Sequence, residues 1–166
     1  MATKDNLAEA FAGESQANRK YLAFAKKAEQ DGFAQAAKLF RAAAEAETIH
    51  AHAHFRVMGG VQGTEPNLQT AIEGEGFEFQ QMYPKFLAEA EAEGNQAAVY
   101  SFKNALAVEE IHHGLYSQAL EAVKSGSDMP EKKIYVCAIC GNTVQGQAPD
   151  VCPVCKAARD KFTEVV

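Results

Sequence analysis

The sequence has no run of 18 or more consecutive apolar residues, so it predicts no membrane-spanning helix. Its first residues lack the apolar stretch and the layout of a signal peptide, and we therefore expect a cytoplasmic protein. Basic residues form no stripe, which argues against a nucleic-acid binder. With 166 residues, of which 47% are apolar, the chain has room for one ordinary domain and a small appendage.

Cysteine is absent from the first 136 residues of the chain. The four cysteines form two Cys-x-x-Cys pairs, Cys137 with Cys140 and Cys152 with Cys155. In a cytosolic chain such pairs favour metal binding over disulfides, and four thiolates at this spacing favour one tetrahedral site. The spacing alone does not separate redox-active iron from structural zinc.

The charge of the chain is acidic and unevenly distributed. All of the net charge of −6 lies in residues 1–126, where 17 acidic side chains stand against 11 basic ones. Residues 127–166 are balanced. An acidic excess often serves solubility alone. Here we interpret part of it as metal ligands, whose charge a bound cation would neutralise.

Four long, Ala-rich segments have helical periodicity. We expect helices over residues 4–31, 33–58, 67–93 and 95–124. The inward stripe of the second helix is expected to carry Phe33, Ala36, Phe40, Ala43, Glu47 and His50. Pro84 lies inside the third segment and predicts a kink there. Residues 127–133 are a linker of small, polar and Pro residues. Residues 134–166 are too few to fold on a core alone, so we expect a metal to stabilise them.

The pattern Glu-x-x-His occurs twice, at Glu47–His50 and at Glu109–His112. A spacing of three places both side chains on one face of a helix. The other two helices add Glu14, Glu75 and Glu78 on stripes that also carry large apolar side chains. Five carboxylates brought together would resist ionisation without a cation. The set therefore predicts a dinuclear iron or manganese site in a four-helix bundle.

The two halves of the helical region are related by a shift of 62 residues. This shift aligns Tyr21 with Tyr83 and Glu47 with Glu109. We interpret the region as a duplicated helical hairpin that brings the two Glu-x-x-His pairs face to face. The symmetry fails where the third helix offers two glutamates against one in the first. Tyr21 and Tyr83 are interpreted either as hydrogen-bond donors to ligating glutamates or as core residues.

These motifs make the chain similar to the rubrerythrins over essentially its full length. The resemblance rests on residues 13–17 and 74–78, on both Glu-x-x-His pairs and on the cysteine knuckles. It implies an all-α, ferritin-like four-helix bundle over residues 1–126, a linker at 127–133 and a rubredoxin-like β/loop domain with four cysteines at 134–166. It also implies two iron ions in the bundle and one iron at the cysteines, with zinc or manganese as substitutes.

The resemblance further implies a role for each residue of the carboxylate and histidine set. Glu47 and Glu109 bridge the two irons, Glu14 binds one of them, and Glu75 and His112 bind the other. The first iron takes Glu78 when oxidised and His50 when reduced. Tyr21 and Tyr83 match the tyrosines that stand beside the ligands.

The activity that the resemblance implies is reduction of hydrogen peroxide to water. Electrons would pass through the rubredoxin-like iron from a separate NAD(P)H-dependent reductase or a rubredoxin. A ferritin-like ferroxidase, which oxidises and holds Fe(II), is the alternative, although storage needs no electron relay. The expected assembly is a homodimer, in which the tail lies past the end of the fourth helix and reaches the partner's site. We expect neither nucleic acid nor membrane as a partner.

Overall fold

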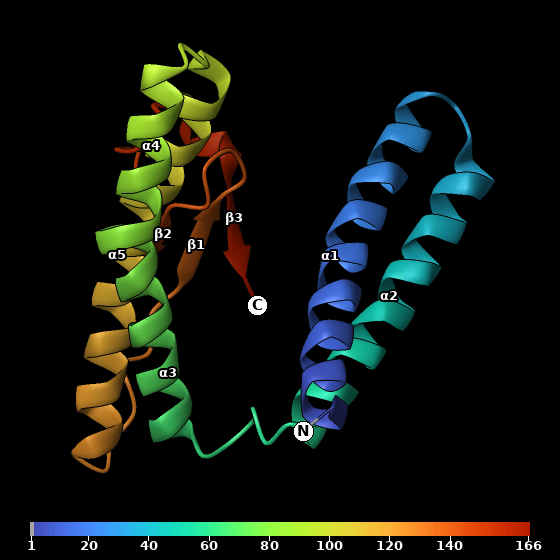
Figure 1. Ribbon diagram of the computed structural model, residues 1–166. Coiled ribbons are helices and arrows are strands. Elements are labelled where there is room, and N and C mark those ends of the chain that lie inside the picture. Colours follow the sequence, from blue (N-terminus) through green and yellow to red (C-terminus); the bar gives the residue numbers. More distant parts are fainter. Residues whose placement is uncertain (1) are drawn as a thin grey trace. The chain divides into compact units, whose positions relative to one another are not determined.

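Two antiparallel helices, α1 (Ala2–Gln30) and α2 (Ala34–Val57), make up the first part of the chain (Figure 1). The computed structural model describes residues 2–166 and divides the chain into two units, residues 1–62 and 63–166. Gly32 follows α1 with a φ of +85°, a conformation that glycine adopts without strain. Both helices agree with the predicted ranges within two residues.

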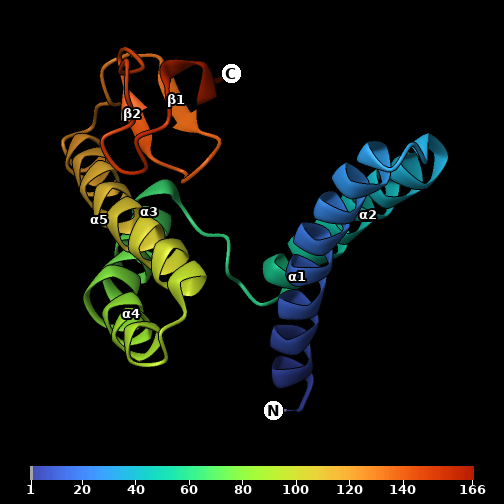
Figure 2. The same cartoon turned by 90° about the horizontal axis from the view of Figure 1, so that it is seen from above.

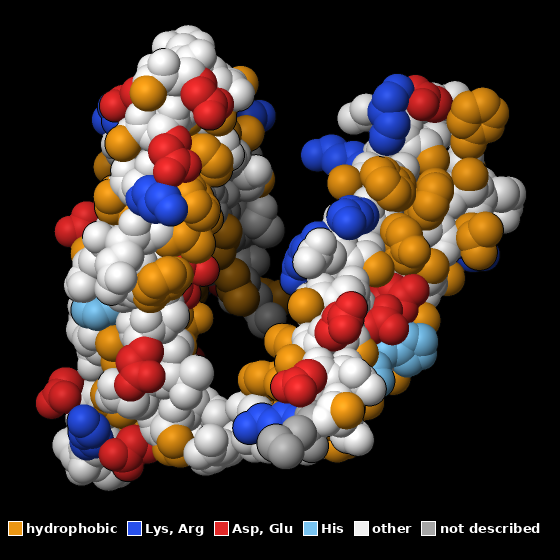
Figure 3. Space-filling view, viewed as in Figure 1, with side chains coloured by type: hydrophobic (Ala, Val, Ile, Leu, Met, Phe, Trp, Pro, Cys, Tyr) orange, Lys and Arg blue, Asp and Glu red, His pale blue; other side chains and the backbone are white. Residues whose placement is uncertain are grey.

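Alanine side chains form the seam between α1 and α2. The buried residues of the two helices are Ala25, Ala28, Ala37, Ala44 and Ala51. Small side chains let the helix axes approach closely, so bulky side chains lie along the margins of the seam. Phe33, expected on the inward stripe, is 65% exposed in this hairpin and does not take part in the seam. Apolar side chains are accordingly visible on the surface of the hairpin in Figure 3.

The helical part of the second unit consists of α3 (Thr64–Phe77), the π-helix η1 (Glu78–Met82), α4 (Tyr83–Ala92) and α5 (Gln96–Lys124). α3 begins a few residues earlier than predicted, because Pro66 is tolerated in the first turn of a helix. Asn95 caps α5, its side-chain oxygen accepting from the N–H of Ala98 at 3.1 Å. Within the described residues 2–166, no helix is both long and apolar enough to cross a membrane.

A π-helical turn takes the place of the kink predicted at Pro84. Proline lacks a backbone N–H and its ring crowds the carbonyl four residues earlier, so a regular α-helix does not run through it undisturbed. The backbone widens over Glu78–Met82 and resumes the α conformation at Tyr83. Because a π turn holds one residue more than an α turn, it changes the face of the helix on which each later side chain lies.

A small antiparallel sheet forms the C-terminal part of the second unit (Figure 2). It consists of β1 (Ile134–Cys137), β2 (Thr143–Gln145) and β3 (Phe162–Val165) in the order β2-β1-β3, with the short 3₁₀ helix η2 (Arg159–Lys161) before β3. Val136 on the central strand pairs with Thr143 on one side and Thr163 on the other. The predicted fold class is therefore confirmed, with four long helical segments followed by a small strand region that holds the four cysteines.

The sheet lies beside α5 and not beyond its end (Figure 1). Gly126, with a φ of +77°, follows α5, and residues 127–133 lead the chain back to β1. Gly141 packs against the helix, since a Cβ atom there would lie in ordinary van der Waals contact with Cγ1 of Val108, at 3.7 Å. The expectation that the tail lies past the end of the fourth helix is wrong, because the linker reverses the direction of the chain.

Candidate metal centres

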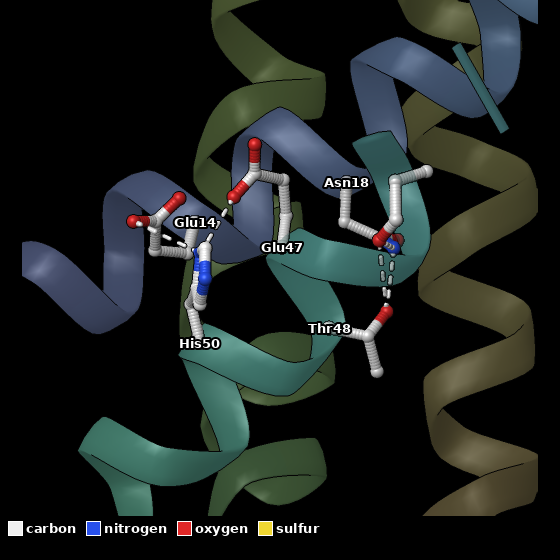
Figure 4. A network of polar contacts seen from close by, with 6 residues as sticks. Glu14, Asn18, Glu47, Thr48 and His50 are labelled. Atoms are coloured by element: carbon white, nitrogen blue, oxygen red, sulfur yellow. Dashed lines mark hydrogen bonds and ion pairs between the residues drawn. The ribbon is translucent and has the colours of Figure 1, made fainter. Parts of the chain in front are cut away.

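The first group of metal-binding side chains lies across the α1–α2 hairpin (Figure 4). Glu14 comes from α1, while Glu47 and His50 come from α2. Nδ1 of His50 is 3.1 Å from Oε2 of Glu47 and 3.9 Å from Oε1 of Glu14. One ligand atom from each residue lies within 4.8 Å of the other two, so this first triad is able to surround one cation.

Asn18 fixes the register of α1 against α2 next to the first triad. Its Nδ2 donates to the carbonyl oxygen of Ala44 at 2.7 Å and to Oγ1 of Thr48 at 2.8 Å. Thr48 in turn donates to the Ala44 carbonyl at 3.1 Å (Figure 4). Because Asn18 lies one turn after Glu14, these bonds hold Glu14 opposite Glu47. No sequence motif marks Asn18, and it was absent from the predicted set.

The second triad repeats this geometry within the second unit. Glu75 comes from α3, while Glu109 and His112 come from α5. Nδ1 of His112 is 2.9 Å from Oε2 of Glu109 and 3.8 Å from Oε1 of Glu75. The structure thus gathers six of the seven predicted carboxylate and histidine ligands into two similar triads, and Glu78 stands outside both.

The two histidines differ at their second ring nitrogen. Nε2 of His112 lies 2.9 Å from Oγ1 of Thr143, the first residue of β2. The side chain of His112 is 26% exposed, whereas that of His50 is 55% exposed. Thr143 escaped prediction because it lies outside the helices and reaches the triad only through tertiary packing.

Burial and neighbouring carboxylates raise pKa values around the second triad. Burial raises the pKa of Glu75 to about 7, and a hydrogen bond with Glu109 and its negative charge add to the effect. Burial and then the charge of Glu109 raise the pKa of Glu78, whereas His112 acts in the opposite direction. Glu78 therefore lies close enough to interact electrostatically with the second triad.

Glu75 is the counterpart of Glu14, but at a shift of 61 residues and not 62. Tyr83 corresponds to Tyr21 at the full shift of 62. The π turn η1 lies between Glu75 and Tyr83 and accommodates the extra residue. Glu78, the glutamate without a partner in the first half, is the first residue of that turn. The change of shift is the sequence signal that could have located the turn.

Tyr21 and Tyr83 occupy matching aromatic clusters. The ring centroid of Tyr21 is 6.2 Å from that of Phe40, and the ring centroid of Tyr83 is 6.2 Å from that of Phe102. Burial raises the pKa of Tyr83, and the charges of the nearby glutamates add to the effect. The hydroxyl of Tyr83 therefore stays protonated near the second triad. Hydrogen bonding from these tyrosines to ligating glutamates stays a prediction.

Both triads fit a hard divalent cation. Each combines two carboxylates with one imidazole, a donor set that suits iron or manganese. Burial first, and then the hydrogen bond and charge of Glu109, raise the pKa of Glu75, so that without a cation its ionised form is disfavoured in the second triad. A bound cation removes this conflict by attracting both carboxylates.

The four cysteines form the third site, as predicted. The sulfur atoms of Cys137 and Cys155 are 3.7 Å apart, and those of Cys140 and Cys152 are also 3.7 Å apart. A tetrahedron with metal–sulfur bonds of ~2.3 Å has edges of about 3.8 Å. The geometry of the four sulfur atoms therefore fits a single tetrahedral metal ion.

Hydrogen-bond donors around the sulfur of Cys152 favour the thiolate form, which binds a metal. Burial opposes ionisation of Cys152, but the backbone N–H groups of Cys155 and Val154 donate to its sulfur and lower its pKa to about 7. Nδ2 of the buried Asn142 donates to the same sulfur at 3.6 Å. Burial raises the pKa of Cys140 to about 12, so that thiolate needs a bound metal to form at neutral pH.

Two matching Glu-Glu-His triads, followed by a four-thiolate sheet domain, define a metal protein of the ferritin-like class with a rubredoxin-like tail. The model of the rubrerythrin family matches residues 5–120. The model of the rubrerythrin rubredoxin-like domain matches residues 135–163. The chain belongs to the rubrerythrin family.

Similar proteins cover nearly the whole chain. Rubrerythrin-2 of Clostridium acetobutylicum is 36% identical over 96% of this chain and 95% of its own. Nigerythrin of Nitratidesulfovibrio vulgaris is 34% identical over 98% of this chain and 86% of its own. A solved structure of nigerythrin in its fully reduced, all-ferrous state matches with a TM-score of 0.59 at 33% identity, covering 98% of this chain and 86% of that chain. The triads are thus of the diiron type and the cysteines form a rubredoxin-like iron site, as predicted.

Proposed function

We propose that this protein reduces hydrogen peroxide to water at a diiron site. The observation that supports the proposal is the contact between the two kinds of metal site. The four-cysteine domain touches α5 at a predicted ligand, where Thr143 meets His112 at 2.9 Å. An electron carrier next to a carboxylate site serves a redox enzyme, whereas iron storage has no need of one.

The proposed ligand roles are those that the family resemblance implies. Glu47 and Glu109 would hold both irons, Glu14 would hold one iron, and Glu75 and His112 would hold the other. Glu78 and His50 would serve as alternative ligands of the first iron in its two redox states. The reason is charge, because an anionic carboxylate suits ferric iron and a neutral imidazole suits ferrous iron.

Each hydrogen peroxide molecule takes up two electrons and two protons when its O–O bond breaks, and two water molecules result. The iron pair, when bound, supplies the electrons for this reduction. The chain itself holds a proton beside the second triad. The Tyr83 hydroxyl keeps its proton because burial and the neighbouring glutamates raise its pKa.

Electrons must come from outside the chain to the rubredoxin-like iron. We propose that an NAD(P)H-dependent reductase or a rubredoxin supplies them. A homodimer is the proposed assembly, and the cytoplasm is the proposed location, because clustered thiols bind metal where disulfides do not form.

Stopped-flow mixing of the reduced, iron-loaded protein with peroxide or with oxygen tests the activity. We expect peroxide to oxidise the diiron site faster than oxygen does. Fast oxidation by oxygen with a sluggish peroxide reaction would instead establish the ferroxidase alternative and overturn the proposal.

Glu78→Ala tests the proposed exchange of ligands. The variant should keep its fold and its iron content but lose about tenfold or more of its peroxide turnover. Glu91→Ala removes an exposed glutamate from α4 and serves as the matched control, with unchanged turnover expected. Wild-type turnover in Glu78→Ala would remove ligand exchange from the mechanism.

A further inference from the structure

The small sheet reaches the second triad through one side chain. Oγ1 of Thr143 lies 2.9 Å from Nε2 of His112 and 3.1 Å from the carbonyl oxygen of Gly141. Gly141 itself faces Val108, one turn before His112 on α5. Thr143 is therefore placed by the strand on one side and by the helix on the other.

The directions of these two hydrogen bonds follow from the groups involved. A carbonyl oxygen only accepts, so the single hydroxyl proton of Thr143 goes to Gly141. Oγ1 then has only lone pairs to offer, and Nε2 of His112 must carry the proton that joins them. A neutral imidazole protonated at Nε2 has its free lone pair on Nδ1. Nδ1 is the atom that faces Glu109 and Glu75.

We infer that Thr143 is a positioning residue, which fixes the ring orientation and the tautomer of His112 so that Nδ1 is the metal ligand. The inference rests on the metal site that the proposed function uses, and not on peroxide chemistry. Hydrogen bonds to the second nitrogen of a ligating histidine contribute about ten- to a hundredfold to metal affinity or activity.

His50 is the counterpart of His112 in the first hairpin, and no bond to its Nε2 is found among the described residues of that unit. Its Nδ1 approaches Glu47 and Glu14 at 3.1 and 3.9 Å, much as Nδ1 of His112 approaches its own glutamates. The contacts found for His50 among the described residues of the first unit all involve Nδ1, and its side chain is more exposed. The repeat thus supplies two similar histidines, of which the small sheet fixes one.

A second consequence concerns the small domain. The tautomer that binds a metal through Nδ1 is the one that donates to Thr143. Metal binding at the second triad and docking of the sheet on α5 therefore stabilise each other, since coupling between two binding events is reciprocal.

The test uses full-length protein with iron at the cysteines and Zn²⁺ added to the metal-free triads. Thr143→Val removes the hydroxyl at nearly constant volume, and Thr143→Ser keeps it. Thr163→Val makes the same change on β3, the opposite edge of the sheet, and is the matched control. Chelator competition gives the Zn²⁺ affinities, and ¹⁵N NMR of the histidine rings gives the tautomers. The absorption of the cysteine-bound iron reports whether the small domain is intact.

We expect Thr143→Val to weaken Zn²⁺ binding at one triad by about tenfold and to leave His112 as a mixture of tautomers. Thr143→Ser and Thr163→Val should retain wild-type affinity, and the His50 signals should not change in any variant. Wild-type affinity and a single Nε2-protonated His112 in Thr143→Val would overturn the inference. Because no reading involves peroxide, failure of the proposed activity would leave this result standing.

Discussion

Glu75 and Tyr83 lie eight positions apart on one continuous helical stretch, and the π turn η1 lies between them. Their counterparts Glu14 and Tyr21 lie seven positions apart in an uninterrupted α-helix. Seven residues are close to two α-helical turns, so Glu14 and Tyr21 share a face. The π turn accommodates one inserted residue and lets Glu75 and Tyr83 share a face as well.

A deletion within η1 should therefore be tolerated. Removing the exposed Gln81 together with Pro84→Ala restores the spacing of seven and permits a regular α-helix. We expect the free energy of unfolding to stay within about 1 kcal/mol of that of Pro84→Ala alone. Urea denaturation followed by circular dichroism measures it.

The matched control is removal of Ala17 from α1. After this deletion Glu14 and Tyr21 lie six positions apart instead of seven, and the preceding side chains are rotated by about 100° around the helix. We expect the free energy of unfolding to fall by about 3 kcal/mol or more, because the alanines before the deletion no longer face α2. Equal losses of unfolding free energy in both deletion variants would show that η1 does not accommodate an inserted residue.

Metal-free protein should lose stability as the pH rises from about 4.5 to 7. The folded-state pKa of Glu75 is raised to about 7 from an ordinary value of 4.5, chiefly by burial. Between these values the folded protein holds a proton that the unfolded chain releases, so raising the pH favours unfolding. Glu75→Gln removes this group, and its unfolding free energy should fall less over the same range. Parallel pH curves for wild type and Glu75→Gln, with Glu91→Gln as the control, would contradict the shift.

Asn142 should raise the reduction potential of the rubredoxin-like iron. Its buried Nδ2 donates to the sulfur of Cys152 at 3.6 Å, and a donor at sulfur stabilises the extra negative charge of the reduced site. We expect Asn142→Ala to lower the potential by an amount on the order of tens of millivolts. Spectroelectrochemistry measures it, and Gln147→Ala, an exposed site in the same domain, is the control. An unchanged potential would assign Asn142 to packing alone.

Asn18→Ala should destabilise the first hairpin and weaken its triad. The change removes the bonds to Ala44 and Thr48, and partly buried hydrogen bonds of this kind contribute about 1–2 kcal/mol together. We expect that loss in thermal unfolding, and a severalfold weaker Zn²⁺ affinity at the first triad. Lys20→Ala, at an exposed position on the same helix, should change neither quantity. A destabilised variant with wild-type Zn²⁺ affinity would show that the hydrogen bonds of Asn18 stabilise the hairpin without positioning the first triad.

The sequence was sufficient to predict the helices, the cysteine site and the members of the two triads. The helical periodicity, the Cys-x-x-Cys pairs and the Glu-x-x-His spacing are local signals, and the structure follows them. The predicted domain limits and the individual ligand roles stay predictions. Helical periodicity alone did not reveal that alanines, and not Phe33, form the seam between α1 and α2.

Two other features depended on relations between distant residues. The π turn was missed because the repeat was aligned with a single shift, although the spacing of Glu75 and Tyr83 already departed from it. The contact of Thr143 with His112 joins residues 31 positions apart, and no local pattern in either segment announces it. A local sequence motif does not predict side chains that reach a site only through tertiary packing.

The position of Thr143 also has an evolutionary consequence. Duplication of a hairpin creates two histidines that are equivalent by descent, and point mutations in the helices are one way to make them diverge. Here the partner of His112 comes from the sheet domain, which lies outside the duplicated residues. The difference in this contact between the two histidines therefore depends on a separate domain and not on the Glu-x-x-His pattern itself.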